Sequence, residues 1–168
     1  LDTYAVQSHQ RAAAATAEGR FDNEIIPVLE KRLDRETGQV IETGELVTAD
    51  EGIRPDSSLE TLAKLKPAFD PENGVVTAGN SSQITDGASA ILIMSEEKAK
   101  ELGLKPRARF HSFSLAGVDP IEMLTGPIPA THKILEKSGL SLDDLDLIEI
   151  NEAFASVVLA WGKEFSPD

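Results

Sequence analysis

The chain has 168 residues, enough for one ordinary domain or for parts of two, and 40% of them are apolar, which is enough to bury an aliphatic core. Acidic residues outnumber basic ones 29 to 16, and the formal net charge of −13 argues against binding to nucleic acid or to an anionic membrane, because phosphate contacts require a net supply of Lys and Arg. The sequence contains no cysteine, which excludes disulfides, a thiolate nucleophile and a Cys-based metal site within these residues, and its three histidines do not have metal-ligand spacing.

The first part of the chain predicts a helix followed by a hairpin. Residues 2–18 carry apolar residues at roughly helical spacing and are rich in alanine, the best helix former, and Gly19 supplies a C-terminal stop. Residues 24–28 have an extended pattern. Residues 28–33 and 39–42 flank a charged turn that contains a glycine, which predicts a hairpin on a solvated surface.

The next segment predicts a second helix and then a turn of small polar residues. Ser57 and Glu60 have the spacing of a capping box, with Ser57 as the N-cap, and Pro67 ends the helix that follows. Residues 75–76 begin a strand that leads into residues 77–82. The small residues of this turn would let a ligand approach the backbone. A tight turn followed by an Asn or Ser cap explains the same pattern.

Strands and helices alternate in the second half of the chain. Residues 90–94 form a continuous apolar run, typical of a strand buried on both faces of a sheet. A serine caps a charged helix at residues 96–102, and residues 107–115 alternate as a strand does. Residues 127–135 predict a helix with proline at its favoured first position and Gly139 at its end, and residues 141–144 predict a turn. This order predicts an α/β layer.

The junction between the last predicted strand, residues 147–150, and the last predicted helix, from Ala153 onward, carries the most chemical information. Asn151 and Glu152 fall at this junction, where the carboxyl end of a strand meets the positive end of a helix and α/β sheets bind their ligands. Asn151 can hold a water or a carbonyl oxygen there. It can also be the helix N-cap, with Glu152 in the first turn, and the two interpretations are compatible.

Five segments of the sequence match a family pattern in order and in spacing. They are Asp50-Glu51 with Arg54, residues 62–69 (LAKLKPAF), residues 76–82 (VTAGNSS) followed by Asp86-Gly87-Ala88, Gly126-Pro127, and residues 151–155 (NEAFA). Together they resemble the thiolase family, the acetyl-CoA acetyltransferases and 3-ketoacyl-CoA thiolases. The resemblance covers essentially all of the chain.

The resemblance implies an α/β fold of the thiolase type, of which this chain would hold a part. Residues 1–84 would be the loop domain that covers coenzyme A, residues 85–106 the end of the N-terminal half, and residues 107–168 the start of the C-terminal half. The family is an acyltransferase of fatty-acid and lipid metabolism that cleaves 3-ketoacyl-CoA with coenzyme A, or condenses two acyl-CoA molecules, through an acyl-cysteine. Coenzyme A is a substrate, no metal or redox cofactor is needed, and intact members are homo-oligomers, either dimers or tetramers.

Four residues match positions at which the family contacts coenzyme A. Arg54 matches a basic residue near the nucleotide end, where a guanidinium can stack on adenine or meet phosphate. Phe69 matches an apolar contact to the same ligand, and Ser82 matches a serine that contacts the pantetheine arm. Thr61 stands where a related serine contacts coenzyme A.

Two further residues match the family's acyl-transfer site. Asn151 matches the asparagine that positions a water in an oxyanion hole, since a thioester enolate needs a donor where its charge develops. Phe154 matches a residue that lines the acyl pocket, although a place in the helix core explains it equally well.

The family's nucleophilic cysteine, the histidine of its His-Pro-x-Gly motif and the second cysteine of its Cys-x-Gly motif have no counterpart in this sequence. We therefore expect an internal piece of a longer thiolase that is inactive alone, because both half-reactions need thiol chemistry. A non-catalytic module that binds coenzyme A or acyl-CoA is the alternative, and an acidic interaction domain that uses the motifs only as caps and turns is a third. The sequence shows no apolar run long enough for a membrane span and no signal peptide, which favours a cytoplasmic location.

Overall fold

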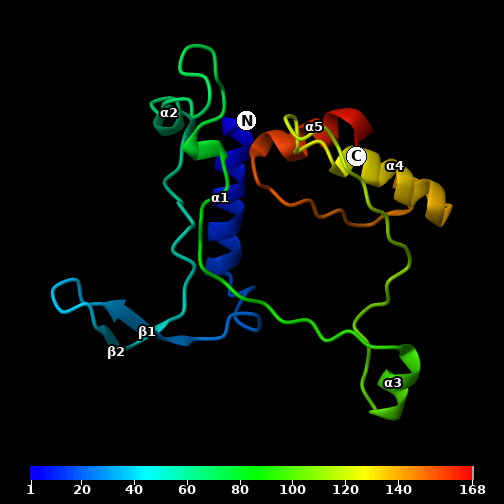
Figure 1. Cartoon of the computed structure of the whole chain (residues 1–168), viewed down its shortest axis with the longest axis horizontal. Helices are drawn as coiled ribbons and strands as arrows, with labels where there is room; N and C mark the ends of the chain where they lie inside the picture. The colour runs from blue at the N-terminus through cyan, green and yellow to red at the C-terminus, as the bar shows by residue number, and fades with distance from the viewer. Residues whose placement is uncertain (168) are drawn as a thin grey trace. The chain divides into compact units, whose positions relative to one another are not determined.

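The computed structural model describes residues 1–167, and these form two compact units, which Figure 1 shows with their elements labelled. One unit is Asp2–Gln83, and the other consists of Leu1 and the residues from Ile84 onward. The boundary lies beside the predicted end of the loop domain at residue 84. The assignment of the units to thiolase domains remains a prediction.

Helix α1 (Asp2–Ala17) organises the first unit and confirms the predicted N-terminal helix. Ala5 is buried, and α1 contacts both the short helix α2 (Leu59–Leu62) and the 3₁₀ helix η1 (Ala78–Asn80). Gly19 closes the turn that follows the helix, with φ of 70° and an N–H that donates to the carbonyl oxygen of Thr16. A left-handed residue at this place closes the last turn, as a glycine cap does.

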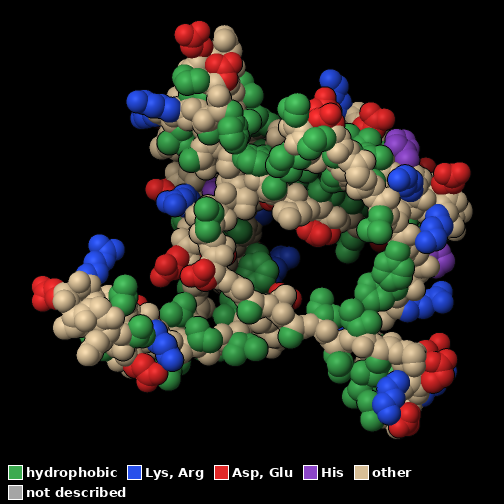
Figure 2. All heavy atoms as spheres, viewed as in Figure 1, with side chains coloured by type: hydrophobic (Ala, Val, Ile, Leu, Met, Phe, Trp, Pro, Cys, Tyr) green, Lys and Arg blue, Asp and Glu red, His purple; other side chains and the backbone are tan. Residues whose placement is uncertain are grey.

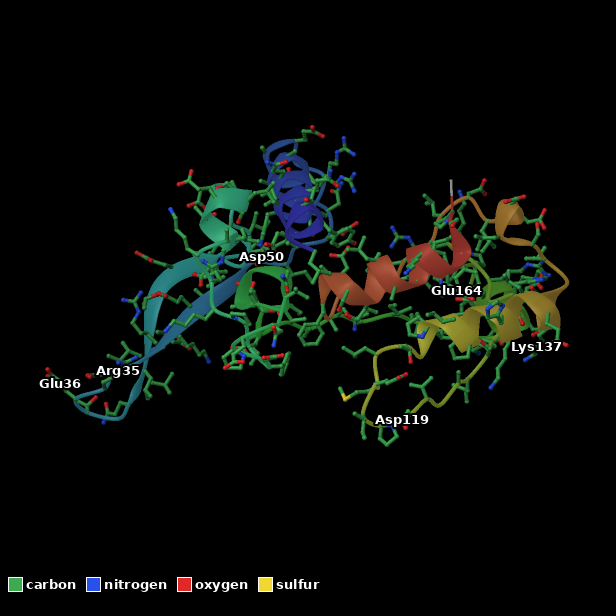
Figure 3. All side chains as sticks on the ribbon, turned by 90° about the horizontal axis from the view of Figure 1, so that it is seen from above. Arg35, Glu36, Asp50, Asp119, Lys137 and Glu164 are labelled. Atoms are coloured by element: carbon green, nitrogen blue, oxygen red, sulfur yellow. The ribbon has the colours of Figure 1, made fainter. Side chains whose placement is uncertain are left out.

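The predicted hairpin is confirmed, with a longer second strand than expected. β1 (Val28–Leu33) pairs antiparallel with β2 (Val40–Val47), and Gly38 has φ of 69° in the turn. Of the segment predicted as extended, residues 24–28, the structure has Glu24 at the end of a turn, residues 25–27 outside any regular element, and Val28 as the first residue of β1. Figure 3 shows Arg35 and Glu36 at the tip of the hairpin.

The hairpin turn depends on the ionised carboxylate of Asp34. Its Oδ1 accepts hydrogen bonds from the backbone N–H groups of Glu36, at 2.8 Å, and Thr37, at 3.3 Å. Hydrogen bonds from the Thr37 side chain and from these two N–H groups lower the pKa of Asp34. The pKa of Asp34 is lower in the folded chain than in the unfolded chain. The carboxylate therefore stabilises the folded turn fully above the ordinary aspartate pKa of about 3.9, and this stabilisation is lost as the pH falls through the lowered pKa.

We predict that the turn loosens selectively in acid. The amide signals of residues 36–38 should shift in nuclear magnetic resonance spectra as the pH falls below about 4, since protonation weakens the acceptor. Asp34→Asn keeps a side-chain oxygen at the same position and does not titrate, so its turn amides should stay constant over this range. Equal shifts in both proteins would contradict the prediction.

Helix α2 begins one residue later than the sequence pattern predicts. Ser58, not Ser57, is the N-cap, with extended φ and ψ of −141° and 160°, and Thr61, not Glu60, completes the capping box. The Thr61 hydroxyl can accept the Ser58 N–H at 3.0 Å, while the Ser58 hydroxyl accepts the Thr61 N–H at 3.2 Å. A Ser-x-x-Thr pair therefore takes the place of the Ser-x-x-Glu pair one residue earlier.

The strand predicted at residues 75–76 is wrong, and a single bridge between Pro67 and Thr77 stands in its place. The N–H of Ala68 also bonds to the carbonyl oxygen of Val76 at 2.8 Å. Proline has no N–H and cannot continue a ladder, so the pairing stops after one step. The predicted tight turn of small residues follows as η1, capped by Thr77.

The second unit is built on two amphipathic helices that pack together. α4 (Pro127–Ser138) and α5 (Ala155–Phe165) are in contact, and the buried Trp161 donates its indole N–H to the hydroxyl of Thr131 at 2.9 Å. Gly139 ends α4 at φ of 73°, as the sequence predicts. Figure 3 labels Lys137 on α4 and Glu164 on α5.

The remaining predictions in this unit divide between local elements and strands. The capped helix is confirmed as α3 (Glu96–Glu101), where Ser95 accepts the N–H of Lys98, and the turn at residues 141–144 is confirmed as the 3₁₀ helix η2 (Leu142–Asp144). The strands predicted at residues 90–94, 107–115 and 147–150 are wrong for the described part of the chain, which has no strand there. Ile91 is 82% exposed and Leu147 is 93% exposed. Figure 2 shows many such apolar side chains at the surface.

A strand needs a neighbouring strand for its hydrogen bonds, and these segments find other partners or none. Residues 113–115 form hydrogen bonds with helix α4 instead of with a strand. The side chain of Lys137 donates to the carbonyl oxygen of Phe113 at 2.9 Å, and that of Lys133 donates to the carbonyl oxygen of Leu115 at 3.1 Å. In the other direction, the hydroxyl of Ser114 donates to the carbonyl oxygen of Ala130 on α4 at 2.8 Å. The alternating pattern is therefore present without a ladder.

Among the described helices, none is long and apolar enough to cross a membrane.

Candidate functional site

Four of the six predicted site residues, Arg54, Thr61, Phe69 and Ser82, lie in the unit Asp2–Gln83. The loop before Arg54 is held to the rest of this unit from two sides. The N–H of Arg54 donates to Nδ1 of His9 on α1 at 3.2 Å, and Nε2 of Gln83 donates to the carbonyl oxygen of Gly52 at 2.5 Å. These two bonds bring the Arg54 loop and the backbone next to Ser82 into one neighbourhood.

Arg54 has the properties expected of a phosphate-binding residue. Its side chain is exposed, and within the described residues the guanidinium takes part in no ion pair. In a chain of net charge −13, a free cation is the group that an anionic ligand needs most. The guanidinium is thus available to such a ligand.

Ser82 and Phe69 both lie at the surface of the unit. The Ser82 hydroxyl donates to the carbonyl oxygen of Gln83 at 3.3 Å, a long bond that a ligand can replace. Phe69 is 75% exposed, and it lies two residues after Pro67, which forms the bridge with Thr77. An exposed aromatic beside a polar turn offers an apolar contact to a ligand.

Thr61 has a structural role that sequence reasoning did not assign to it. Its hydroxyl donates to the carbonyl oxygen of Ser58 at 2.9 Å in addition to its part in the capping box. The residue is exposed, so a ligand can still reach it. Its contact with coenzyme A stays a prediction.

Asn80 is a buried neighbour of Ser82 for which the sequence analysis offered only a role as a cap. It is 4% exposed, and its amide forms three hydrogen bonds: Nδ2 donates to Oδ1 of Asp2 at 2.8 Å and to the carbonyl oxygen of Val75 at 3.0 Å, and Oδ1 accepts the N–H of Thr77 at 3.0 Å. Asn80 therefore joins α1 to the turn that presents Ser82. The Thr-x-x-Asn spacing of Thr77 and Asn80, a capping box, is the signal that identifies it.

Asn151 and Phe154 lie in the other unit, directly before α5. The N-cap of α5 is Phe154, and its extended φ and ψ of −143° and 150° place the helix start at Ala155. The interpretation of Asn151 as the N-cap is therefore wrong. The Asn151 side chain is exposed and forms no hydrogen bond within the described residues, so its amide is available to a ligand. Phe154 is half-buried, and its role in an acyl pocket stays a prediction.

Metal binding has no candidate site in residues 1–167, where no group of three or more His, Asp or Glu side chains is placed to hold an ion. The expectation that no cofactor is needed stays a prediction.

Two family descriptions match adjacent parts of the sequence. The thiolase N-terminal domain matches residues 1–97, and the thiolase C-terminal domain matches residues 104–168. The chain belongs to the thiolase family. The resemblance seen in the five motifs is thereby confirmed.

Curated relatives of this thiolase chain are named 3-ketoacyl-CoA thiolase. That of Psychrobacter cryohalolentis is 55% identical over 155 residues, which are 92% of this chain and 38% of the relative. That of Photobacterium profundum is 53% identical over 163 residues, which are 97% of this chain and 40% of the relative. The chain thus spans about 40% of the length of the curated relatives that it matches.

Solved thiolase structures confirm a partial thiolase fold. The acetyl-CoA acetyltransferase of Bacillus anthracis is 47% identical, with a TM-score of 0.87, over 99% of this chain and 40% of that structure. Human mitochondrial 3-ketoacyl-CoA thiolase in complex with CoA is 41% identical, with a TM-score of 0.86, over 99% of this chain and 39% of that structure. The predicted fold class is correct, although the predicted central strands do not form in this chain.

Proposed function

We propose that this chain supplies the coenzyme A-binding surface and the oxyanion-hole asparagine of a 3-ketoacyl-CoA thiolase. That enzyme cleaves 3-ketoacyl-CoA with coenzyme A, or condenses two acyl-CoA molecules in the reverse direction. The observation that carries the proposal is the identity of 53% with a 3-ketoacyl-CoA thiolase over 97% of the chain. A relative solved with CoA bound, 41% identical, supports the choice of ligand.

Arg54, Phe69 and Ser82 are the residues proposed to bind coenzyme A, with Thr61 as a further contact. Arg54 offers the positive charge that the phosphates and adenine of the nucleotide end require. Phe69 offers an exposed apolar surface, and Ser82 a hydroxyl for the amides of the pantetheine arm. All four lie in one compact unit, as a contiguous ligand surface would need.

Asn151 is the residue proposed to act on the reacting thioester. Its amide N–H donates, through a water or directly, to the oxygen on which negative charge develops when the thioester forms an enolate. The start of α5 supports the proposal, because Phe154 is the N-cap and the Asn151 side chain forms no hydrogen bond within the described residues. Phe154 is proposed to line the acyl pocket beside it.

The chain has no cysteine, so the acyl-cysteine of the reaction has to form on residues that are not among these 168. We therefore propose that the chain alone is inactive in thiolysis. The same observation favours the second candidate, a module that binds coenzyme A or acyl-CoA without catalysis. A cytoplasmic location and assembly into a homo-oligomer remain predictions.

A chimera tests the proposed function without assuming anything about the ends of the chain. In the Photobacterium profundum thiolase, the 163 aligned residues are replaced by those of this chain. We expect the chimera to thiolyse 3-ketoacyl-CoA at a rate within about tenfold of the parent thiolase, while the isolated chain shows no turnover. A folded but inactive chimera, together with tight binding of coenzyme A to the isolated chain, would favour the non-catalytic module.

A further inference from the structure

The Arg54 loop is anchored to α1 by one side chain that lies far away in the sequence. Nδ1 of His9 accepts the N–H of Arg54 at 3.2 Å across a separation of 45 residues. His9 is half-buried, and an accepting Nδ1 means that the neutral ring carries its proton on Nε2. A leucine of similar size would leave this N–H without its partner.

A second side chain holds the same loop from the other direction. Nε2 of Gln83 donates to the carbonyl oxygen of Gly52 at 2.5 Å, and the N–H of Gly52 donates to Oδ1 of Asp50 at 2.7 Å. Figure 3 labels Asp50 at the start of this loop. Gln83 directly follows Ser82, so the backbone that presents Ser82 also fixes the loop that presents Arg54.

The other hydrogen bonds of the loop among the described residues are local, such as the one from the N–H of Ser57 to the carbonyl oxygen of Arg54 at 3.1 Å. Residues 50–56 contain only turns and irregular backbone, and Arg54 and its neighbour Pro55 are exposed. Ordering a loop of this kind when a ligand binds costs conformational entropy, and a loop that is already fixed avoids that cost. The two long-range bonds therefore bear on ligand affinity as well as on folding.

We propose that His9 and Gln83 form a clamp that positions the Arg54 loop for the nucleotide end of coenzyme A. Neither side chain has to touch the ligand: His9 fixes the backbone of Arg54, and Gln83 fixes the loop relative to Ser82. The clamp rests on the proposed function, because Arg54 is assigned there to the nucleotide. It adds two positioning residues that the family motifs do not contain.

The test uses the full 168-residue chain and four variants: His9→Leu, His9→Asn, Gln83→Leu and Arg54→Ala. Calorimetry measures the affinity for coenzyme A and for pantetheine, which lacks the nucleotide. His9→Leu and Gln83→Leu should each weaken coenzyme A binding roughly three- to tenfold, the effect of one hydrogen bond, and leave pantetheine binding unchanged. His9→Asn places an oxygen where Nδ1 stood and should restore affinity to within about twofold.

Hydrogen exchange of the Arg54 amide measures the clamp without any ligand. Its exchange should become roughly three- to tenfold faster in His9→Leu and return toward the original rate in His9→Asn. An unchanged exchange rate in His9→Leu would overturn the clamp, as would a loss of affinity that extends to pantetheine or that asparagine does not rescue.

Arg54→Ala separates failure of the clamp from failure of the proposed function. This variant should weaken coenzyme A binding by about tenfold or more, since it removes a charged partner of the phosphates. If Arg54→Ala leaves the affinity unchanged, the nucleotide site proposed under the function is wrong, and the clamp loses its role in binding with it. If Arg54→Ala weakens binding and His9→Leu does not, the clamp alone is wrong.

Discussion

Replacing Asn151 with alanine is expected to lower kcat for thiolysis by roughly 10²–10³ in the chimeric enzyme that carries this chain, because removal of one oxyanion-hole donor has an effect of that size. KM for the 3-ketoacyl-CoA should change little. An interaction made only in the transition state lowers kcat and kcat/KM together. Steady-state kinetics with a short and a long 3-ketoacyl-CoA measures both parameters.

The structural case for this result is the position of Asn151 relative to α5. An asparagine just before a helix is most simply explained as its N-cap, yet the cap here is Phe154, three residues later. The exposed amide of Asn151 serves no hydrogen bond within the described residues. Alanine at this position should therefore leave the stability of α5 unchanged, and the kinetic loss should be free of a folding defect.

Two variants control the Asn151 measurement. Asn151→Asp keeps the shape but replaces the donor with a carboxylate oxygen, so it should be as inactive as alanine. Asn23→Ala is the same truncation at an exposed asparagine in the other unit, and it should leave kcat unchanged. A rise in KM with kcat intact would assign Asn151 to substrate binding instead of to the oxyanion hole.

The elements that the sequence predicted correctly are those fixed by local interactions. Gly139 ends α4 in a left-handed conformation, Ser95 caps α3, and the Asp34 turn closes the hairpin, all within a few residues of chain. Caps and turns act through the nearest backbone groups, so their signals are readable from short segments. The displaced N-cap of α2 shows the limit, because two adjacent serines compete and the Thr61 hydroxyl decides between them.

The predicted strands fail for the opposite reason. An apolar run such as residues 90–94 indicates that both faces of a strand would be buried, but it does not specify which strands would pair with it. Within the described residues those partners are not present, and Ile91 and Ile93 remain exposed. A strand is a property of at least two segments, so a pattern in one segment predicts a preference and not a structure.

The residues of the candidate site also fall into two groups, those that the sequence identified and those that only the fold identifies. Resemblance to the family identified Arg54 and Ser82 as candidate ligand contacts, whereas Asn151 was already singled out by its place between a predicted strand and a predicted helix. It could not identify His9, because a lone histidine on an alanine-rich helix carries no signal until the fold brings it to the N–H of Arg54. The residues that support a site are recognised by their contacts, and a single sequence does not show contacts between distant segments.

Replacing Asn80 with alanine is expected to destabilise the unit Asp2–Gln83 by about 2–4 kcal/mol, because the N–H of the buried Thr77 and the carbonyl oxygen of Val75 lose their partner together. Truncation of a buried amide with all of its hydrogen bonds made lowers stability, since the polar groups that lose their partner cannot form hydrogen bonds to water instead. Hydrogen exchange of the α1 amides measures the local free energy of unfolding, because Asp2 of α1 is the third partner of Asn80.

Asn80→Ala has controls at two levels. Asp2→Ala removes one of the three hydrogen bonds and should destabilise α1 by less than Asn80→Ala does, by about 1 kcal/mol. Asn73→Ala truncates an exposed asparagine of the same unit and should stay within about 0.5 kcal/mol of the original chain. The amides of α5 belong to the other compact unit and should keep their protection in every variant. If Asn80→Ala proves no worse than Asn73→Ala, Asn80 does not join α1 to the Ser82 turn, and the surface proposed for coenzyme A loses its structural support.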